Sequence, residues 1–375
     1  MQIYQQKIFD SQEFTKSNIE FNPDVFFLFV SPTFPNIENL VAKINADFKD
    51  IKVIGCSTAG EILGNEVLDD SVALTAVNFE KTKTKIVAIN LDECSLDSEV
   101  AGNKISEKLK APDLRHIFVL SDGLLVNGAD LVSGLHSKLD KSVSITGGLA
   151  GDGSDFKNTF IINNDEVHSR KIVALGLYGK DIKISFGSKG GWDSFGVERL
   201  VTKSKNNILY ELDGEPALAL YKSFLSEKAK DLPGSGLLFP LSMRNEYNQI
   251  PVVRTILGIN ESDQSLTFAG NIPEGSYVRL MKANVDRIIN GAEESALISK
   301  NNTENNHQLA FLISCVGRRL VMKQLVEEEV EAVNDVFDNN IYTTGFYSYG
   351  EIAPFDEFSP CALHNQTMTI TTLAE

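Results

Sequence analysis

Apolar residues along the chain repeat one order of elements three times. Largely apolar runs at 25–30, 116–120 and 309–313 predict strands buried on both faces, because they lack the polar alternation of half-exposed strands. Each run ends at a serine and is followed by apolar residues at helical spacing and then by a second short strand. This order predicts an α/β fold with mixed sheets, in which a strand-helix-strand unit is duplicated.

Further apolar stretches predict the strands between and after these units. Residues 71–79 and 84–90 are interpreted as one pair of adjacent strands, and residues 171–178 and 181–186 as another. Residues 363–373 alternate in character and predict a single terminal strand.

The repeat is interrupted between about residues 190 and 299. Turn residues are frequent there, and Pro216 marks the first turn of a predicted helix. A second helix is predicted at 286–298, and the polar run 301–306 predicts a flexible loop before the third unit.

The second strand of each unit leads into a glycine-containing turn, and an acidic residue directly follows a glycine of that turn. Two turns have the spacing Gly, four residues, Gly-Glu-Ile and end at Glu61 and Glu351, while a looser copy ends at Asp152. Glycines let the backbone turn sharply and approach a bound molecule, and open α/β sheets bind ligands at the carboxyl ends of their strands. We therefore predict that these turns line a ligand site. The alternative is that they are only the tight turns of a repeated fold, and the sequence does not say which copy forms the pocket.

Charged groups at these turns suggest what the ligand carries. Glu61, Asp152 and Glu351 could accept hydrogen bonds from the ammonium of an amino acid, or could instead satisfy backbone N–H groups of their own turns, an alternative favoured for Asp152. Arg318, interpreted as the inward member of an arginine pair, could bind a carboxylate, or could pair with the acidic run 327–329.

The other predicted ligand-binding residues offer hydroxyl, thiol, aromatic or amide groups, or a close approach of the backbone. They are Cys56, Ser57, Thr58, Gly60, Gly148, Tyr347, Tyr349 and Asn365. The tyrosines could equally be core packing. A nucleophile at Cys56 or Ser57 would need a base within reach, and none is close in sequence, so the chain is predicted not to be an enzyme.

Composition narrows the class of protein. The 375 residues carry a formal net charge of -16 and no basic cluster, which disfavours nucleic acid and anionic membranes as partners. The longest apolar runs are far too short to cross a bilayer. The four cysteines lack the spacing of a metal site or redox motif and are predicted to be reduced thiols of a cytoplasmic protein without a metal.

Six segments in this order resemble the FIST family, which pairs an N-terminal and a C-terminal FIST domain. They are Ile54–Ile62, Thr146–Gly153, Glu211–Ala217, Ser314–Arg319, Gly345–Ile352 and Leu363–Thr367. The resemblance implies a FIST N-terminal domain at 22–200, a C-terminal domain at 201–360 and a terminal strand at 361–375.

The resemblance also implies a function. FIST proteins are sensory modules of signal transduction, with amino acids and similar metabolites proposed as ligands and no fixed catalytic residues. We therefore expect a sensor that binds a small molecule and reports to a separate partner protein, without a cofactor. One alternative is a haem-based nitric oxide sensor that regulates a histidine kinase, in which His364 would be the axial ligand rather than a brace for the third turn. Another is an interaction scaffold without a ligand.

Overall fold

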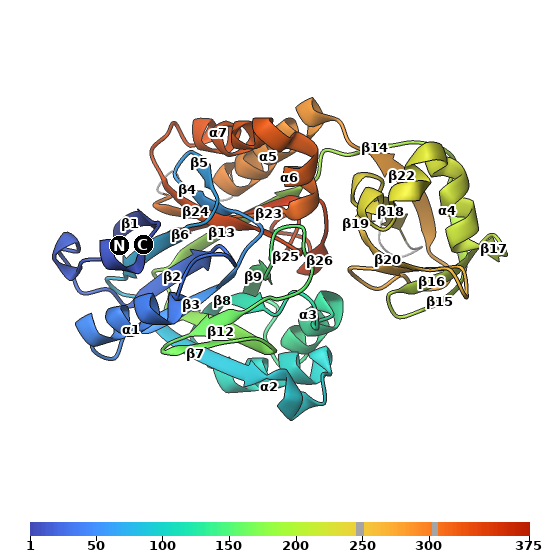
Figure 1. The fold of residues 1–375 in the computed structure, drawn as a ribbon. Coiled ribbons are helices and arrows are strands. Elements are labelled where there is room, and N and C mark those ends of the chain that lie inside the picture. The colour runs from blue at the N-terminus through green and yellow to red at the C-terminus, as the bar shows by residue number, and fades with distance from the viewer. Residues whose placement is uncertain (245–250, 302–306) are drawn as a thin grey trace.

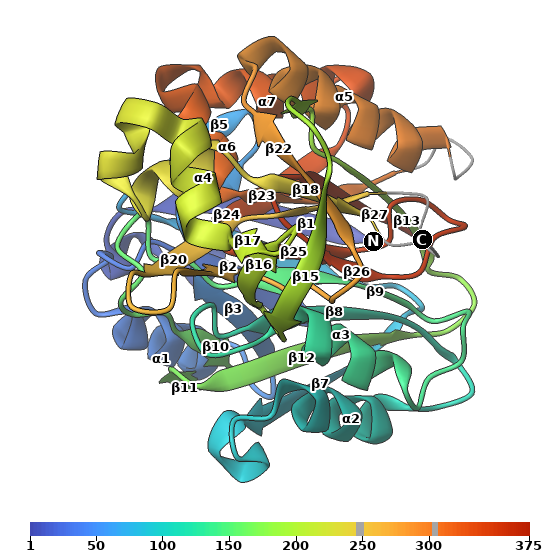
Figure 2. The same cartoon turned by 90° about the vertical axis from the view of Figure 1, so that its right-hand side faces the viewer.

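The computed structural model describes residues 1–244, 251–301 and 307–375, so nearly all of the predicted loop at 301–306 lies outside the described residues. Figure 1 shows a large body and a small lobe, and Figure 2 shows the same molecule with the small lobe toward the viewer. The small lobe is formed by residues 193–244 and 251–282, which lie between a strand (183–189) and a helix (285–301) of the large body.

The large body consists of three units in chain order. The first unit comprises β1 (Gln2–Ile8), β2 (Val25–Val30), α1 (Ile37–Asp47), β3 (Lys52–Ser57), β4 (Glu61–Leu63), β5 (Glu66–Leu68) and β6 (Val72–Asn78). The second comprises β7 (Lys83–Asn90), α2 (Ser98–Leu109), β8 (Leu114–Ser121), α3 (Gly128–His136), β9 (Ser144–Leu149), β10 (Ile161–Asn163), β11 (Glu166–His168) and β12 (Lys171–Tyr178). The third comprises β13 (Lys183–Lys189), α5 (Val285–Asn301), β23 (Leu309–Cys315), α6 (Val316–Met322), α7 (Val326–Val336), β24 (Tyr342–Ser348), β25 (Gly350–Ala353), β26 (Ala362–His364) and β27 (Met368–Ala374).

The small lobe interrupts the third unit between β13 and α5. It comprises β14 (Asp193–Ser194), β15 (Arg199–Lys205), β16 (Ile208–Leu212), β17 (Glu215–Pro216), α4 (Ala217–Leu225), β18 (Leu241–Arg244), β19 (Val252–Arg254), β20 (Ile256–Asn260), β21 (Ser265–Phe268) and β22 (Tyr277–Lys282). Its strands form one antiparallel sheet with a hydrophobic core of its own, against which α4 packs.

Within the described residues, the three units build three six-stranded sheets with one shared strand order. The orders are β1-β6-β2-β3-β10-β11, β7-β12-β8-β9-β25-β26 and β13-β27-β23-β24-β4-β5. In each sheet the two central strands of a unit are parallel, and the last two strands are a hairpin from another unit. The hairpin that follows each glycine turn therefore completes a neighbouring sheet, and the large body has approximate threefold symmetry.

Three equivalent phenylalanines meet where the sheets face one another. Phe27, Phe118 and Phe311 occupy the same place in the first central strand of their units, and their ring centroids are 4.7–5.7 Å apart. All three rings are almost fully buried. Aromatic rings at such distances bury large apolar areas and favour fixed edge or tilted contacts, so this cluster anchors the three sheets to one another.

Both predicted strand pairs were wrong. Residues 72–78 form β6, which pairs with β1 and β2, whereas residues 83–90 form β7, which pairs with β12 in another sheet. Likewise β13 pairs with β27 and not with β12. The chain passes from one sheet to the next at these points. β6 already lies between β1 and β2, and β12 already lies between β7 and β8, so neither can pair with the strand that follows it in the chain.

The prediction of a single terminal strand at 363–373 was also wrong, because these residues form two strands in different sheets. β26 pairs with β25, and β27 lies between β13 and β23. The break includes Gln366, which has a φ of 63°. No helix among the described residues combines the length and the apolar character that crossing a membrane requires.

Candidate functional site

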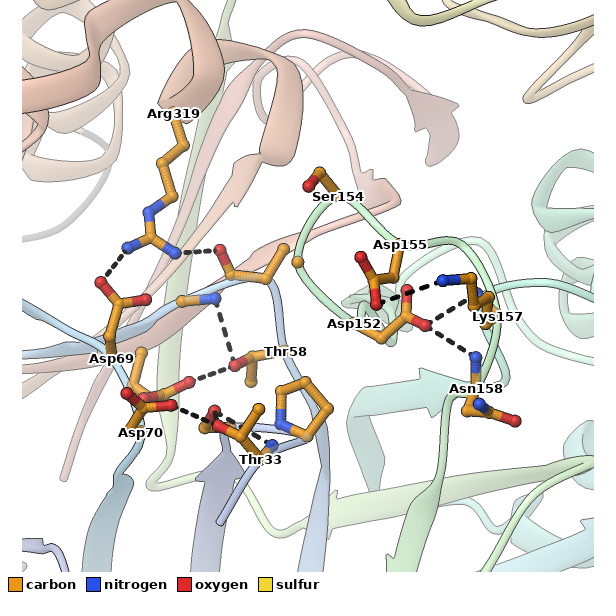
Figure 3. A pocket seen from close by; sticks show the side chains of 16 residues that line it. Thr33, Thr58, Asp69, Asp70, Asp152, Ser154, Asp155, Lys157, Asn158 and Arg319 are labelled. Carbon is orange, nitrogen blue, oxygen red and sulfur yellow. Dashed lines mark hydrogen bonds and ion pairs between the residues drawn. The ribbon is translucent and has the colours of Figure 1, made fainter.

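A polar cavity of about 450 Å³ opens at the carboxyl ends of β2, β3 and β9 (Figure 3). We call it the acidic cavity. It is lined by Ser31, Pro32, Thr33, Thr58, Ala59, Gly60, Glu61, Asp69, Asp70, Asp152, Gly153, Ser154, Asp155, Lys157, Asn158 and Arg319. A volume of this size suits a small metabolite.

The parallel pairing of β2 with β3 brings two turns to this edge. Ser31 to Thr33 follow β2, and Thr58 to Glu61 follow β3. Gly60 has a φ of 130°, and a Cβ at this position would collide with the guanidinium of Arg319. A side chain there would thus be strained and would also displace Arg319 from the cavity wall.

Glu61 is the innermost carboxyl group of the acidic cavity, with 1% of its surface exposed. The hydroxyl of Thr58 donates to Oε1 of Glu61, and the hydroxyl of Ser71 donates to Oε2 at 2.8 Å. Burial raises the pKa of Glu61 from 4.5 to about 7, although both hydroxyl groups oppose the shift. Glu61 can therefore change its charge near neutral pH.

Asp152 holds the loop that forms the opposite wall. Its carboxylate accepts hydrogen bonds from the backbone N–H groups of Phe156 at 2.9 Å, and of Lys157 and Asn158 at 2.7 Å each. It also accepts one from the hydroxyl of Tyr349. Asp152 thus has the turn-bracing role that was the alternative for it, while its side chain also faces the cavity.

The charges around the acidic cavity are unbalanced. Five carboxyl groups line it against two cationic side chains. Arg319 donates to Asp69 at 2.6 Å and to the carbonyl of Ala59 at 2.6 Å, and Lys157 lies 3.7 Å from Asp155. Asp70 accepts the hydroxyl of Thr33 and has no ion pair among the described residues. The cavity therefore favours a ligand with positive charge.

Arg318 lies outside the cavity wall, because its guanidinium is bound within the protein. It is fully buried and donates to Glu329 at 2.9 Å through Nε and at 2.6 Å through Nη2. The same carboxylate accepts from Ser314 at 3.0 Å and from Tyr347 at 2.6 Å. Arg318 therefore forms an ion pair with Glu329 of the acidic run 327–329, which was the alternative to a role in ligand binding. Sequence reasoning missed Arg319, the member of the arginine pair that lines the cavity.

Glu351 occupies a site of its own and does not line the acidic cavity. It accepts from the hydroxyl of Ser348 at 2.8 Å, and from the backbone N–H at 3.1 Å and the hydroxyl at 2.9 Å of Thr367. Burial raises the pKa of Glu351 to about 8. Glu61 and Glu351 are therefore both buried, but only Glu61 lines the acidic cavity.

The remaining predicted residues are mostly packed inside the body. Cys56 and Gly148 are buried within strands, and burial raises the pKa of the Cys56 thiol well above its usual value. The hydroxyl of Ser57 accepts the N–H of Phe160 at 3.0 Å. Asn365 is fully buried next to β26. Of the predicted ligand-binding residues, Thr58, Gly60, Glu61 and Asp152 line the acidic cavity.

His364 braces the third turn and does not fit a haem ligand. Its Nε2 lies 2.7 Å from the carbonyl oxygen of Ala353, its ring packs edge-on against Phe355, and 1% of its surface is exposed. Burial lowers the pKa of His364 to about 4. Haem coordination would require Nε2 to break this hydrogen bond and a flat cofactor to enter the packed core. Among the described residues there is no cluster of three or more His, Cys, Asp or Glu that could hold a metal ion.

The large body thus consists of three repeated α/β units, with a polar cavity of metabolite size at the strand ends of one edge. A family model of the FIST N domain matches residues 24–215, and one of the FIST C domain matches residues 217–354. The chain belongs to the FIST family, whose domains are sensory parts of signal transduction thought to bind small ligands.

Individual relatives add little about function. An uncharacterized protein of Methanocaldococcus jannaschii is 25% identical over 317 residues, which cover 78% of this chain and 60% of that protein. The chain thus spans less than two thirds of the length of this relative. A crystal structure of a chorismatase aligns over 100% of this chain and 98% of its own, with 9% identity and a TM-score of 0.34. A likeness this low carries no argument about function.

Proposed function

We propose that the chain is a cytoplasmic sensor that binds an amino acid or a related metabolite in the acidic cavity and reports to a separate partner protein. The excess of five carboxyl groups over two cationic side chains around one hollow is the observation that supports this most. An interaction scaffold without a ligand would leave no such cavity at the glycine turn.

The cavity wall offers a complementary partner for each of the two charged groups of a zwitterionic ligand. Its ammonium would lie beside Asp70 and Glu61, where carboxyl oxygens can accept short, charge-assisted hydrogen bonds. Its carboxylate would lie beside Arg319. The existing partner of Arg319, Asp69, has 69% of its side chain exposed, and exposed ion pairs contribute little, so a ligand carboxylate can compete for the guanidinium.

Binding in this place can be relayed because all three units contribute to the wall. Thr58 comes from the first unit, Asp152 from the second and Arg319 from the third. A ligand that contacts all three stabilises their arrangement by mass action, since it binds the assembled cavity. The partner, a histidine kinase or another signalling protein, would recognise that arrangement, and the sensor would act without chemical change of the ligand.

The test is a thermal-shift and calorimetric panel of basic, neutral and acidic amino acids, simple diamines and simple dicarboxylic acids. We expect stabilisation by ligands with an ammonium group and none by those with only negative charge. Asp70→Asn should weaken the binding at least about tenfold, because a hydrogen bond to a charged group contributes about 1.5–3 kcal/mol.

The matched control is Asp165→Asn, which removes one exposed carboxylate from the turn between β10 and β11, outside the cavity. This variant should bind like the wild type. If no member of the panel stabilises the protein, or if both variants weaken binding equally, the proposed site is refuted.

A further inference from the structure

The carboxylate arrangement of Glu61 is repeated at Glu351. Each glutamate accepts the hydroxyl of a residue three positions earlier, Thr58 in one case and Ser348 in the other. Each also accepts a hydroxyl from the residue directly before the last strand of its unit, Ser71 before β6 and Thr367 before β27. The third unit therefore contains a counterpart of the inner wall of the acidic cavity.

The two residues at the equivalent positions of the third unit are amides instead of acids. Asp69 and Asp70 precede Ser71, and Asn365 and Gln366 precede Thr367. The backbone is the same at the second position of each pair, with φ of 52° at Asp70 and 63° at Gln366. The third unit thus keeps the geometry and loses two negative charges, so a ligand there would differ in charge from one in the acidic cavity.

The small lobe covers this part of the third unit. Nε2 of Gln366 donates to the carbonyl of Leu237 in the lobe at 3.0 Å, and Nε1 of Trp192, which directly precedes the lobe, donates to the backbone carbonyl of Gln366 at 2.9 Å. From β19, Arg254 donates to the carbonyl of Leu363 at 3.1 Å. The acidic cavity, in contrast, has exposed groups in its wall, since 69% of the Asp69 side chain is exposed.

Beneath this cover, polar groups have no partner among the described residues. Both the oxygen and the nitrogen of the Asn365 side chain are buried without a hydrogen bond, and so is Oε1 of Gln366. Buried polar atoms almost always have partners, because leaving one unsatisfied costs about 1–3 kcal/mol. At these two adjacent amides, an additional hydrogen-bonding partner would therefore be stabilising.

We propose that Asn365 and Gln366 form a second binding site, covered by the small lobe, for a small molecule with a primary carboxamide group. A carboxamide can pair with the Asn365 side chain through two hydrogen bonds, N–H to Oδ1 and Nδ2–H to C=O, and its second N–H can reach Oε1 of Gln366. An ammonium group would leave the N–H donors of Asn365 unpaired. A carboxylate would leave both amide oxygens unpaired and would lie near Glu351.

The site also explains why the lobe is held where it is. Asn365 is fully buried, so a ligand can enter only when the lobe moves away from β26. A bound carboxamide would then favour the closed position, since it satisfies groups that are unsatisfied without it. This second site is independent of the ligand proposed for the acidic cavity.

The test uses propionamide as the probe and N,N-dimethylpropionamide, which lacks N–H donors, as the matched ligand. Ligand-observed NMR and thermal shift should show binding of propionamide at millimolar concentration and at least tenfold weaker binding of the dimethyl compound. Asn365→Leu should abolish the propionamide effect without lowering the melting temperature of the ligand-free protein. Gln366→Met, in which the side chain has a similar volume, should weaken the binding of propionamide. It is the second test variant, used if Asn365→Leu does not fold.

Two controls separate this site from the acidic cavity. Thr33→Val, in the acidic cavity, should leave propionamide binding unchanged, and Asn365→Leu should leave amine binding unchanged. A crystal soaked with propionamide should show the amide at Asn365. Absence of binding by NMR, an ordered water as the only occupant at Asn365, or equal binding of the dimethyl compound would overturn the proposal.

Discussion

Replacing Glu61 by Gln tests whether the buried carboxyl group of the acidic cavity is protonated in the folded protein. Gln has nearly the same shape and stays neutral at every pH. The wild-type carboxyl group has a pKa raised by burial from 4.5 to about 7, so the folded state holds a proton that the unfolded state releases. The variant removes this difference and keeps the contacts with Thr58 and Ser71 available.

The size and sign of the effect follow from linkage. Because the folded pKa is raised, the stability that Glu61 contributes is fully present below pH 4.5, falls as the pH rises, and is lost above about pH 7. At about 1.4 kcal/mol per pH unit, the loss across this window is on the order of 3 kcal/mol. We expect Glu61→Gln to gain about this much free energy of unfolding relative to the wild type between pH 5 and pH 8.

Urea denaturation at several pH values measures this difference directly. Taking the variant against the wild type at each pH cancels the titration of the other groups. Glu331→Gln, on an exposed position of α7, is the control and should give a difference that does not change with pH. If the difference for Glu61→Gln is also constant from pH 5 to 8, Glu61 is ionised throughout and the reasoning from its burial is wrong.

Three more predictions follow from other contacts. Arg318→Met should lower the free energy of unfolding by about 3–5 kcal/mol, because it leaves Glu329 charged and buried, and the double variant with Glu329→Gln should recover part of it in urea melts. Gly147→Ala should cost at least about 2 kcal/mol, since φ is 150° and the new Cβ would collide with a carbonyl oxygen, whereas Gly234→Ala, in open space, should be close to neutral. Affinity for an amine should rise up to about tenfold from pH 6 to pH 8 as Glu61 ionises, and calorimetry should show no such rise in Glu61→Gln.

The sequence predicted the units well because their signal is local. The apolar runs at 25–30 and 309–313 are central strands, and the helix expected at 286–298 lies within α5. Strand pairing cannot be predicted in this way, because the pattern within one segment does not indicate which distant segment lies beside it in the sheet. For this reason the sequence favours a pair of β6 and β7, although the two strands belong to different sheets.

The acidic cavity was predictable on the side that carries the glycine turn. Thr58 and Glu61 follow a buried strand, and the strand-end rule places them correctly. The same rule, applied to the first central strand, would also have found Thr33. The sequence does not show whether Arg318 or Arg319 lines the cavity, because neighbouring residues of a helix point about 100° apart and the packing of α6 decides which side chain reaches the wall.

Because each unit supplies a hairpin to a neighbouring sheet, the three units of one chain can evolve different sites. The strands that close each sheet come from elsewhere in the chain, so three separate polypeptides of one unit each could form the same ring. A ring of identical subunits must alter all three of its crevices with every mutation. In a single continuous chain, a mutation alters one of the three equivalent places only. The acidic cavity can therefore keep its carboxyl groups, while the equivalent place in the third unit has the amides of Asn365 and Gln366 and an inserted lobe.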